Sequence, residues 1–160
     1  MSKMDFRDIQ DKASIREVLG CILLDPALLD DHALYIEDFA EPFHQLVYLA
    51  ISNLYIAGNT KLDAFIIDSY LKENRPAKYP IYQRNNGNKY IELMMEIAEP
   101  DNFEANYNDL KKFTALRQLY LQGFDITEIF DPDEIDPQIA EQKRHRLEEM
   151  AVGDILDVFK

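Results

Sequence analysis

One stretch, Asp101–Phe124, constrains the fold more than any other because its apolar residues recur at helical spacing. Successive apolar positions are three or four residues apart, so all of them can lie on one face of an α-helix. This face comprises Phe103, Tyr107, Leu110, Phe113, Leu116, Tyr120 and Phe124. Asp101 and Glu104 have the spacing of a capping box, which would start the helix. Leu119 and Leu121 lie off the face and widen the apolar surface. We predict either a core helix or a helix that also offers one side to a partner subunit.

The composition is that of a globular protein in a reducing compartment. Hydrophobic residues make up 47% of the 160 residues, which argues against disorder and allows one domain with a real core. No apolar run approaches the roughly 18 residues that a membrane helix needs. The N-terminus lacks the basic-then-apolar pattern of a signal peptide, and the single cysteine, Cys21, cannot form an internal disulfide. We therefore expect a cytoplasmic protein without a membrane segment.

The charge balance bears on the partners of the chain. Acidic residues outnumber basic residues 30 to 17, which gives a formal net charge of −13. Such a surface repels phosphate backbones, so strong direct binding to nucleic acid is not expected. A basic protein partner is the more natural inference. No stretch alternates apolar and polar residues as a half-buried strand would, and the fold class is therefore predicted to be all-α.

Caps and prolines divide the first hundred residues into short elements. Residues 1–13 are polar and expected to be flexible, although Phe6 and Ile9 could dock as a short turn. Residues 14–100 are predicted to form a compact head of about five short helices. The first two predicted helices begin at Ser14 and at Asp25-Pro26, and the second runs to about Ile36. The next three begin at Pro42, at Thr60 with Asp63 as cap, and at Tyr90; the first of these ends at Gly58 and the last at Ala98. The segment Asn74–Asn88 is predicted to be an exposed loop.

Residues 101–160 are predicted to form a two-helix hairpin that leads toward a linker. An acidic turn, Asp131–Pro137, follows the first long helix, and a second helix runs from Pro137 with Gly153 as its weak point. This second helix is polar through Arg146 and then apolar. We hypothesise that Leu116, Leu119, Tyr120 and Phe124 pair with Leu147, Met150 and Ile155 within and between hairpins. In this arrangement Leu119 and Leu121 face another subunit.

No constellation of residues points to catalysis, to a cofactor or to a metal. The three histidines, His32, His44 and His145, are far apart and lack a second ligand type at metal spacing. The carboxylates of 131–136 lack the pattern of a calcium loop. The chain has no P-loop, no nucleophile elbow and no Cys/His pair of catalytic type. A basic cluster, Lys143, Arg144 and Arg146, is predicted to be a solvated face with at most a weak partner or phosphate contact.

Two segments of the head resemble the N-terminal domain of the DnaB family of bacterial and phage replicative DNA helicases. Val18–Pro26 reads Val-Leu-Gly-Cys-Ile-Leu-Leu-Asp-Pro, and Glu37–Ile51 reads Glu-Asp-Phe-Ala-Glu-Pro-Phe-His-Gln-Leu-Val-Tyr-Leu-Ala-Ile. Both are similar to signatures of that family in order and spacing. Weaker similarities lie at Gly58, Tyr90-Ile91, Asn102 with Glu104, and Leu116-Arg117. The chain departs from the family at Ile15-Arg16, where Glu-Gln is usual, and at Gly87, where Gly-Gly is usual. These departures suggest a phage or mobile-element relative.

The resemblance implies both a fold and a role. Family members have a helical head and a helical hairpin, the hairpins pair into dimers, and three dimers form a collar on the hexamer. The collar binds primase, and a separate motor domain hydrolyses ATP with Mg²⁺. The chain would then be a non-catalytic domain for oligomerisation and for docking primase or a helicase loader, within a parent that is an ATP-dependent DNA helicase. We expect the motor to lie beyond Lys160, since the last helical pattern ends without a cap.

Two other functions remain open at this point. A stand-alone adaptor of a phage or mobile element could use the same fold to load or inhibit a host helicase. A stop codon after Lys160 would favour that adaptor, and a downstream P-loop would favour the helicase. An acidic DNA mimic is suggested by the charge of −13, and its binding to a DNA-binding protein would weaken steeply with salt.

Overall fold

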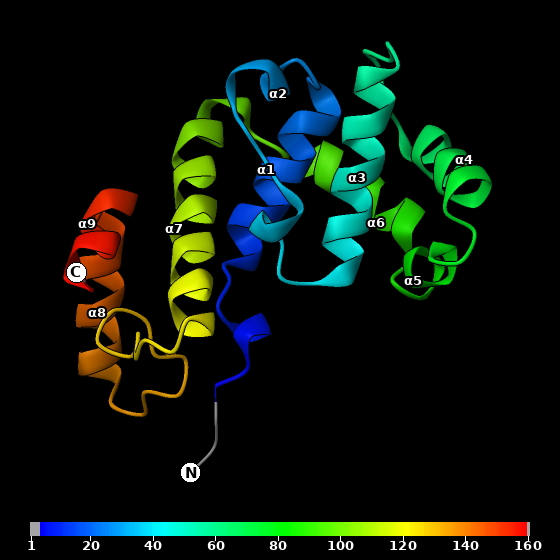
Figure 1. The fold of residues 1–160 in the computed structure, drawn as a ribbon. Coiled ribbons are helices and arrows are strands. Elements are labelled where there is room, and N and C mark those ends of the chain that lie inside the picture. Colours follow the sequence, from blue (N-terminus) through cyan, green and yellow to red (C-terminus); the bar gives the residue numbers. More distant parts are fainter. Residues whose placement is uncertain (1–3, 160) are drawn as a thin grey trace.

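The computed structural model describes residues 4–159, and these residues form helices and connecting segments without a β-strand (Figure 1). The all-α prediction is confirmed. The α-helices are α1 (Lys12–Leu24), α2 (Leu28–Asp31), α3 (Pro42–Ile56), α4 (Ala64–Asn74), α5 (Tyr79–Arg84), α6 (Gly87–Ile97), α7 (Phe103–Leu121), α8 (Pro137–Glu149) and α9 (Val152–Val158). Three short 3-10 helices are η1 (Phe6–Asp8), η2 (Ile36–Asp38) and η3 (Pro100–Asn102).

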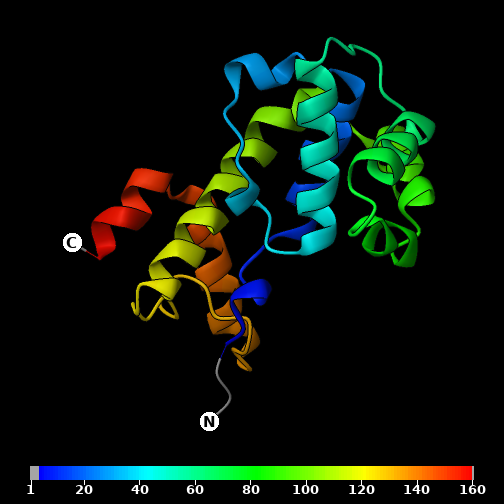
Figure 2. The same ribbon diagram turned by 45° about the vertical axis from the view of Figure 1, so that its right-hand side comes forward.

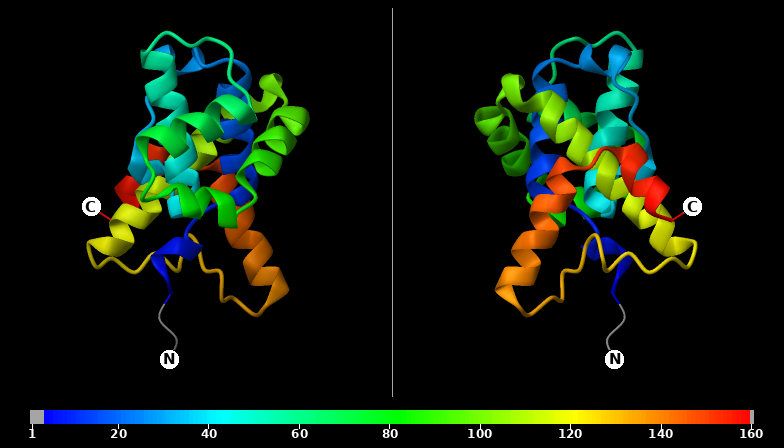
Figure 3. Two further views of the ribbon diagram at one scale, coloured as in Figure 1. Left: turned by 90° about the vertical axis from the view of Figure 1, so that its right-hand side faces the viewer. Right: turned by 90° about the vertical axis from the view of Figure 1, so that its left-hand side faces the viewer.

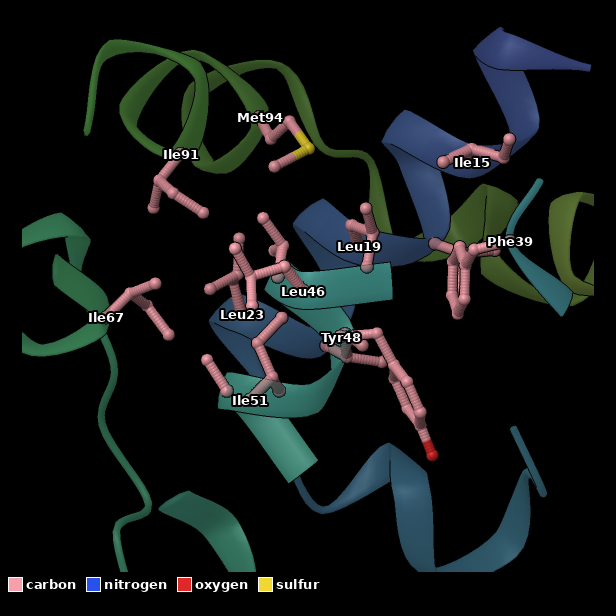
Figure 4. Packing of buried hydrophobic residues seen from close by; sticks show 14 of the residues in the cluster. Ile15, Leu19, Leu23, Phe39, Leu46, Tyr48, Ile51, Ile67, Ile91 and Met94 are labelled. Carbon is pink, nitrogen blue, oxygen red and sulfur yellow. The ribbon is translucent and has the colours of Figure 1, made fainter. Parts of the chain in front are cut away.

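The head is built around α1, which packs against α6 on one side and α7 on the other. Apolar side chains from α1, α3, α4 and α6 converge in the centre of the head, as Figure 4 shows for Leu23, Ile51, Ile67 and Ile91. All four side chains are fully buried. Burial of each such side chain contributes roughly 1.5–3 kcal/mol, so this shared core, rather than any local helix propensity, holds the short helices in place.

Gly20 allows α1 and α6 to approach one another closely. A Cβ atom at Gly20 would lie 2.5 Å from the carbonyl oxygen of Met94 and 2.9 Å from the Cβ atom of Ala98. Real Cβ contacts are longer than this, so only glycine fits without displacement of α6. The glycine of the Val18–Pro26 segment therefore has a packing role.

The predicted start of α1 is wrong. Before it, the predicted alternative of a short turn at Phe6 and Ile9 is confirmed, because η1 spans Phe6–Asp8. Asp11, not Ser14, caps α1, because its carboxylate accepts hydrogen bonds from the backbone N–H groups of Ala13 and Ser14. Ile9 is fully buried, so the preceding segment is fixed by packing. Residues 1–3 of the predicted flexible segment lie outside the described residues.

The segment Asn74–Asn88 is not simply a loop, because α5 lies within it. Pro80 occupies the first turn of α5, where its missing N–H costs nothing. Tyr82 anchors the helix and is 1% exposed. Asn86 adopts a left-handed conformation (φ 52°), and α6 then starts at Gly87, where a Cβ atom would lie 2.4 Å from the ring of Tyr82. The head thus has six α-helices rather than about five within the described residues.

Two other predicted helix boundaries differ from those in the structure. The second helix spans only Leu28–Asp31, because the backbone becomes extended at His32. The capping box of Asp101 and Glu104 does not form. Instead η3 leads directly into α7, which has no side-chain cap.

The long helix ends earlier than predicted, at Leu121. Gly123 has a φ of +97°, and the N–H groups of Gly123 and Phe124 donate to the carbonyl oxygens of Tyr120 and Leu119. This is the Schellman arrangement of a helix C-terminus. Phe124 therefore lies just beyond α7.

The predicted second arm of the hairpin is two helices joined by a bend. Met150 and Ala151 have extended backbones, and the N–H of Ala151 donates to the carboxylate of Asp154 at 2.9 Å, which starts α9. Gly153, the predicted weak point, lies inside α9. Figure 2 and the right-hand view of Figure 3 show α8 and α9 as separate helices that meet at this bend.

Candidate functional site

The predicted interface residues gather around α7, which lies between the head and α8–α9 (Figure 1). A second hydrophobic cluster, here the hairpin core, surrounds the C-terminal half of α7. It consists of Ile9, Phe113, Leu116, Leu119, Ile126, Ile129, Leu147 and Ile155, with Tyr120 and Met150 packed against it. Leu116, Leu119, Leu147 and Ile155 therefore belong to one buried cluster within a single chain. Pairing between two chains stays a prediction.

The orientation predicted for Leu119 is wrong, because this side chain is 7% exposed and belongs to the hairpin core. Ile126 and Ile129, from the segment between α7 and α8, are each 1% exposed in the same cluster and help to cover this part of α7. Leu121 differs, since its side chain is 67% exposed. Phe124 is also exposed, at 40%.

The path of α8 and α9 follows from two contacts with α7 and its C-terminal extension. Lys112 donates from Nζ to the carbonyl oxygens of Leu147 and Glu148, at 3.1 and 3.0 Å. Twelve residues farther along each segment, the rings of Phe124 and Phe159 lie 5.5 Å apart. The C-terminal end of α8 therefore lies against the middle of α7, and α9 then runs along α7 toward its C-terminal end. Lys112 also caps α8, since it satisfies carbonyl groups at the end of that helix.

The C-terminal ends of α7 and α9 carry exposed apolar side chains, and we call this region the hairpin tip. It consists of Leu121, Phe124, Leu156 and Val158, and the last two are 43% and 41% exposed. The contact between Phe124 and Phe159 brings the two ends together. Exposed apolar groups of this kind mark candidate docking surfaces.

The basic cluster on α8 is largely used inside the chain. Lys143 donates to the carbonyl oxygen of Thr127 at 2.9 Å and lies 3.6 Å from a carboxylate oxygen of Glu134. Arg144 forms ion pairs with Glu141, three residues before it, and with Glu148, four residues after it. These pairs raise the pKa of Arg144.

Arg146 differs from its two neighbours because it makes no ion pair within residues 4–159. Its side chain is exposed and lines a shallow hollow with Thr127 and Ile139. Of the three basic residues, Arg146 is the one left available to a partner.

A buried polar network joins α7 to the head. Asp38 is 1% exposed, and one of its carboxylate oxygens accepts hydrogen bonds from the N–H of Tyr35 at 2.8 Å and from Nζ of Lys111 at 2.7 Å. Its other oxygen accepts a hydrogen bond from the hydroxyl of Thr114 at 2.8 Å. Each charge in the network has a partner, which a buried charge needs.

Arg117 extends this junction to the N-terminal segment. Its guanidinium is 4% exposed and donates to the carbonyl oxygens of Ile9, at 2.6 Å, and Glu37, at 3.0 Å. Burial lowers its pKa to about 10, so the side chain stays charged near neutral pH. Sequence reasoning missed this role, although Glu37-Asp38 and Leu116-Arg117 both fall in the segments that resemble the DnaB family.

The described residues offer no arrangement typical of catalysis by a metal. Between residues 4 and 159, no group of three His, Cys, Asp or Glu side chains is placed to hold a metal ion. His32 is hydrogen bonded to the carbonyl oxygen of Leu28 and to Glu104, and His145 faces Glu141. Over the same residues, the helices are too short or too polar to cross a membrane.

The comparisons with known proteins place the chain in a family. The family model described as DnaB-like helicase N terminal domain matches residues 10–112. The SPbeta prophage-derived uncharacterized protein YorI of Bacillus subtilis (strain 168) is 38% identical over an alignment of 155 residues, and the match covers 95% of this chain and 31% of the relative. The chain thus spans less than a third of that relative's length.

A solved structure shows the same fold. The crystal structure of the N-terminal domain of DnaB helicase from Mycobacterium tuberculosis matches with a TM-score of 0.61 and 23% identity, covering 86% of this chain and 96% of that one. The match to the family model extends over most of the head and into α7. The resemblance found in the sequence is confirmed, and the chain belongs to the family of DnaB-like helicase N-terminal domains.

Proposed function

We propose that this chain is the collar domain of a hexameric replicative DNA helicase and acts in DNA replication by mediating oligomerisation. The observation that carries the proposal is the hairpin tip, where Leu121 and Phe124 are exposed beside α9 in a chain of the DnaB-like family. In this function two hairpins pair through their tips, and three such dimers form the hexamer. The domain has no catalytic role.

The exposed side chains of the tip contribute to dimerisation on the same scale as the cost of association. Full burial of a large apolar side chain contributes roughly 1.5–3 kcal/mol. A two-fold interface uses each of the four tip residues twice, and because these side chains are already about half buried, complete burial of the rest contributes roughly 6–11 kcal/mol. Association costs about 4–15 kcal/mol. Closure of three dimers into a ring would add the stability that one dimer lacks.

The same domain docks primase or a helicase loader in this proposal. The net charge of −13 favours a partner that presents a basic surface, and Arg146 is the basic side chain of α8 left for a weak polar contact. The prophage origin of the relative YorI supports a phage or mobile-element parent that acts in the bacterial cytoplasm. ATP and Mg²⁺ belong to a separate motor domain of that parent, so this domain holds no catalytic cofactor.

The oligomeric state of the purified chain tests the proposal. Light scattering coupled to size exclusion should show a dimer that dissociates on dilution, and the double variant Leu121→Asp, Phe124→Asp should be monomeric. Ile56→Asp is the matched control, because Ile56 is 79% exposed at the end of α3 in the head. A wild-type chain that stays monomeric at high concentration would falsify the dimer. The tip would be excluded as the interface if Ile56→Asp disrupted the dimer as much as the double variant does.

A stand-alone adaptor is the second candidate function, because the hairpin tip could equally dock on the collar of another helicase. Mixing the chain with a host replicative helicase distinguishes the two. Stable binding to that hexamer by a chain that does not dimerise favours the adaptor, and dimerisation without such binding favours the collar. A DNA mimic would instead bind a DNA-binding protein in a strongly salt-dependent manner.

A further inference from the structure

A cavity on the head gathers basic side chains in an otherwise acidic protein. Its volume is about 550 Å³, and it lies where the N-terminal ends of α1 and α3 meet α5 and α6. Its walls come from Lys12, Arg16, Glu41, Pro42, Phe43, His44, Ile81, Arg84, Asn85 and Tyr90. The cavity is separate from the hairpin tip, and the proposed collar function does not use it.

Three cations line the cavity without an ion-pair partner. Lys12, Arg16 and Arg84 are exposed, and none forms an ion pair within the described residues, although the chain carries 30 acidic residues. Glu41 supplies the one carboxylate among the lining residues. The cavity therefore keeps an excess of two positive charges in a chain whose net charge is −13.

The start of α3 adds to this positive potential. Glu41 is the N-cap residue of the 15-residue helix, and its side chain makes no capping hydrogen bond. The backbone N–H groups of the first turn lack acceptors within the helix, and the helix dipole places partial positive charge at this end. The arrangement suits an anion, provided that the rest of the cavity fits one.

Neutral groups complete the walls. His44 is 5% exposed, its Nε2 lies 3.2 Å from the hydroxyl of Tyr90, and its Nδ1 is buried without a hydrogen-bond partner, 3.4 Å from a carboxylate oxygen of Glu41. Burial lowers the pKa of His44 to about 4, so the imidazole is neutral near pH 7. The rings of Phe43 and Tyr90 meet edge to face, with centroids 5.1 Å apart. The cavity thus pairs a cationic rim with an aromatic wall.

We propose that this cavity binds a small phosphate monoester as its dianion. The excess of two positive charges matches a phosphate dianion, whereas a single carboxylate would leave one charge without a counterpart. The guanidinium groups of Arg16 and Arg84 suit phosphate oxygens because each presents a planar fork of donors. The aromatic wall and Ile81 contact the organic part of the ester. The volume of the cavity exceeds what an inorganic ion needs, which also favours an ester.

Titration of the intact chain, followed by backbone amide NMR in a phosphate-free buffer of constant ionic strength, tests the site. The probes are inorganic phosphate, adenosine 5′-monophosphate and acetate. Both phosphates should give saturable shifts at the lining residues, the nucleotide with the higher affinity, and acetate should not saturate. Saturation by acetate at matched concentration overturns the assignment to a dianion. Equal affinity for phosphate and nucleotide overturns the assignment to an ester.

Three variants test whether the nucleotide binds in the cavity. Arg16→Ala should weaken binding of the nucleotide about tenfold or more, the loss of one charge-assisted hydrogen bond. Glu41→Gln should tighten it, since the opposing carboxylate is removed. Arg146→Ala, an exposed arginine on α8, is the control and should leave the affinity unchanged. All three positions are at the surface, and circular dichroism verifies the fold. Equal effects of Arg16→Ala and Arg146→Ala would contradict the proposal.

Discussion

Replacement of Gly20 by alanine should destabilise the head, and the structure gives the size of the effect. The new Cβ atom would lie 2.5 Å from the carbonyl oxygen of Met94. Ordinary contact begins near 3.4 Å, so the backbone of α6 must move away by about 0.9 Å. Because Met94 and Ile91 of α6 are buried in the head core, this shift loosens contacts on the far side of α6 as well.

The net change is a balance of two opposing terms. Overpacking of a core costs about 1–3 kcal/mol, and the upper part of this range applies because the obstacle is backbone rather than a flexible side chain. Alanine regains about 1 kcal/mol through its higher helix propensity. We therefore expect Gly20→Ala to lower the free energy of unfolding by about 1–2 kcal/mol.

Urea unfolding followed by far-ultraviolet circular dichroism measures this change. Gly153→Ala is the matched control, since Gly153 lies in α9 and no atom comes within 4 Å of the position that the alanine methyl group would take. The control should raise the free energy of unfolding by up to about 1 kcal/mol. If Gly20→Ala proves as stable as wild type while Gly153→Ala behaves as expected, the close approach of α1 and α6 is not as described.

Three further variants test the buried polar groups and a cap. Arg117→Met should lower the free energy of unfolding by about 3 kcal/mol in urea titrations, because the carbonyl groups of Ile9 and Glu37 lose their buried donor. His44 has a pKa lowered from 6.5 to about 4 by burial, so wild type should lose about 3 kcal/mol as the pH falls through that interval. His44→Gln should lack this component when unfolding is compared across pH, and an identical pH profile would contradict it. Asp154→Ala removes the acceptor for the N–H of Ala151 at the start of α9 and should cost about 1 kcal/mol, measurable as a lower thermal midpoint.

Periodicity and capping chemistry were enough to predict most of the helices. The spacing of Phe103, Leu110 and Leu116 identified α7, and Pro42 and Gly58 marked the ends of α3, where Gly58 has the positive φ of a helix stop. Helix α5 was not predictable in this way. The surrounding segment, Asn74–Asn88, has the proline and asparagine content typical of a loop. Helix α5 is held by burial of Tyr82, a tertiary contact that local sequence does not encode.

The sequence identifies the apolar residues of the candidate site, but it does not show which of their side chains stay exposed. Helical spacing shows that Leu119 and Leu121 lie off the main face of α7, yet it does not show what covers each side chain. Ile126 and Ile129, in a segment without helical periodicity, belong to the same buried cluster as Leu119. The bend at Met150 likewise depends on a local competition, the hydrogen bond from Ala151 to Asp154, which an apolar pattern does not reveal.

Helix α7 contributes to both hydrophobic cores, and this has a consequence for how the chain can be divided. Phe103 and Leu110 are part of the head core, whereas Leu116 belongs to the hairpin core, which also includes Ile9. The predicted boundary at residue 100 therefore cuts through shared packing. A fragment that stops there would lack part of its own interior, and head and hairpin should melt together as one cooperative unit.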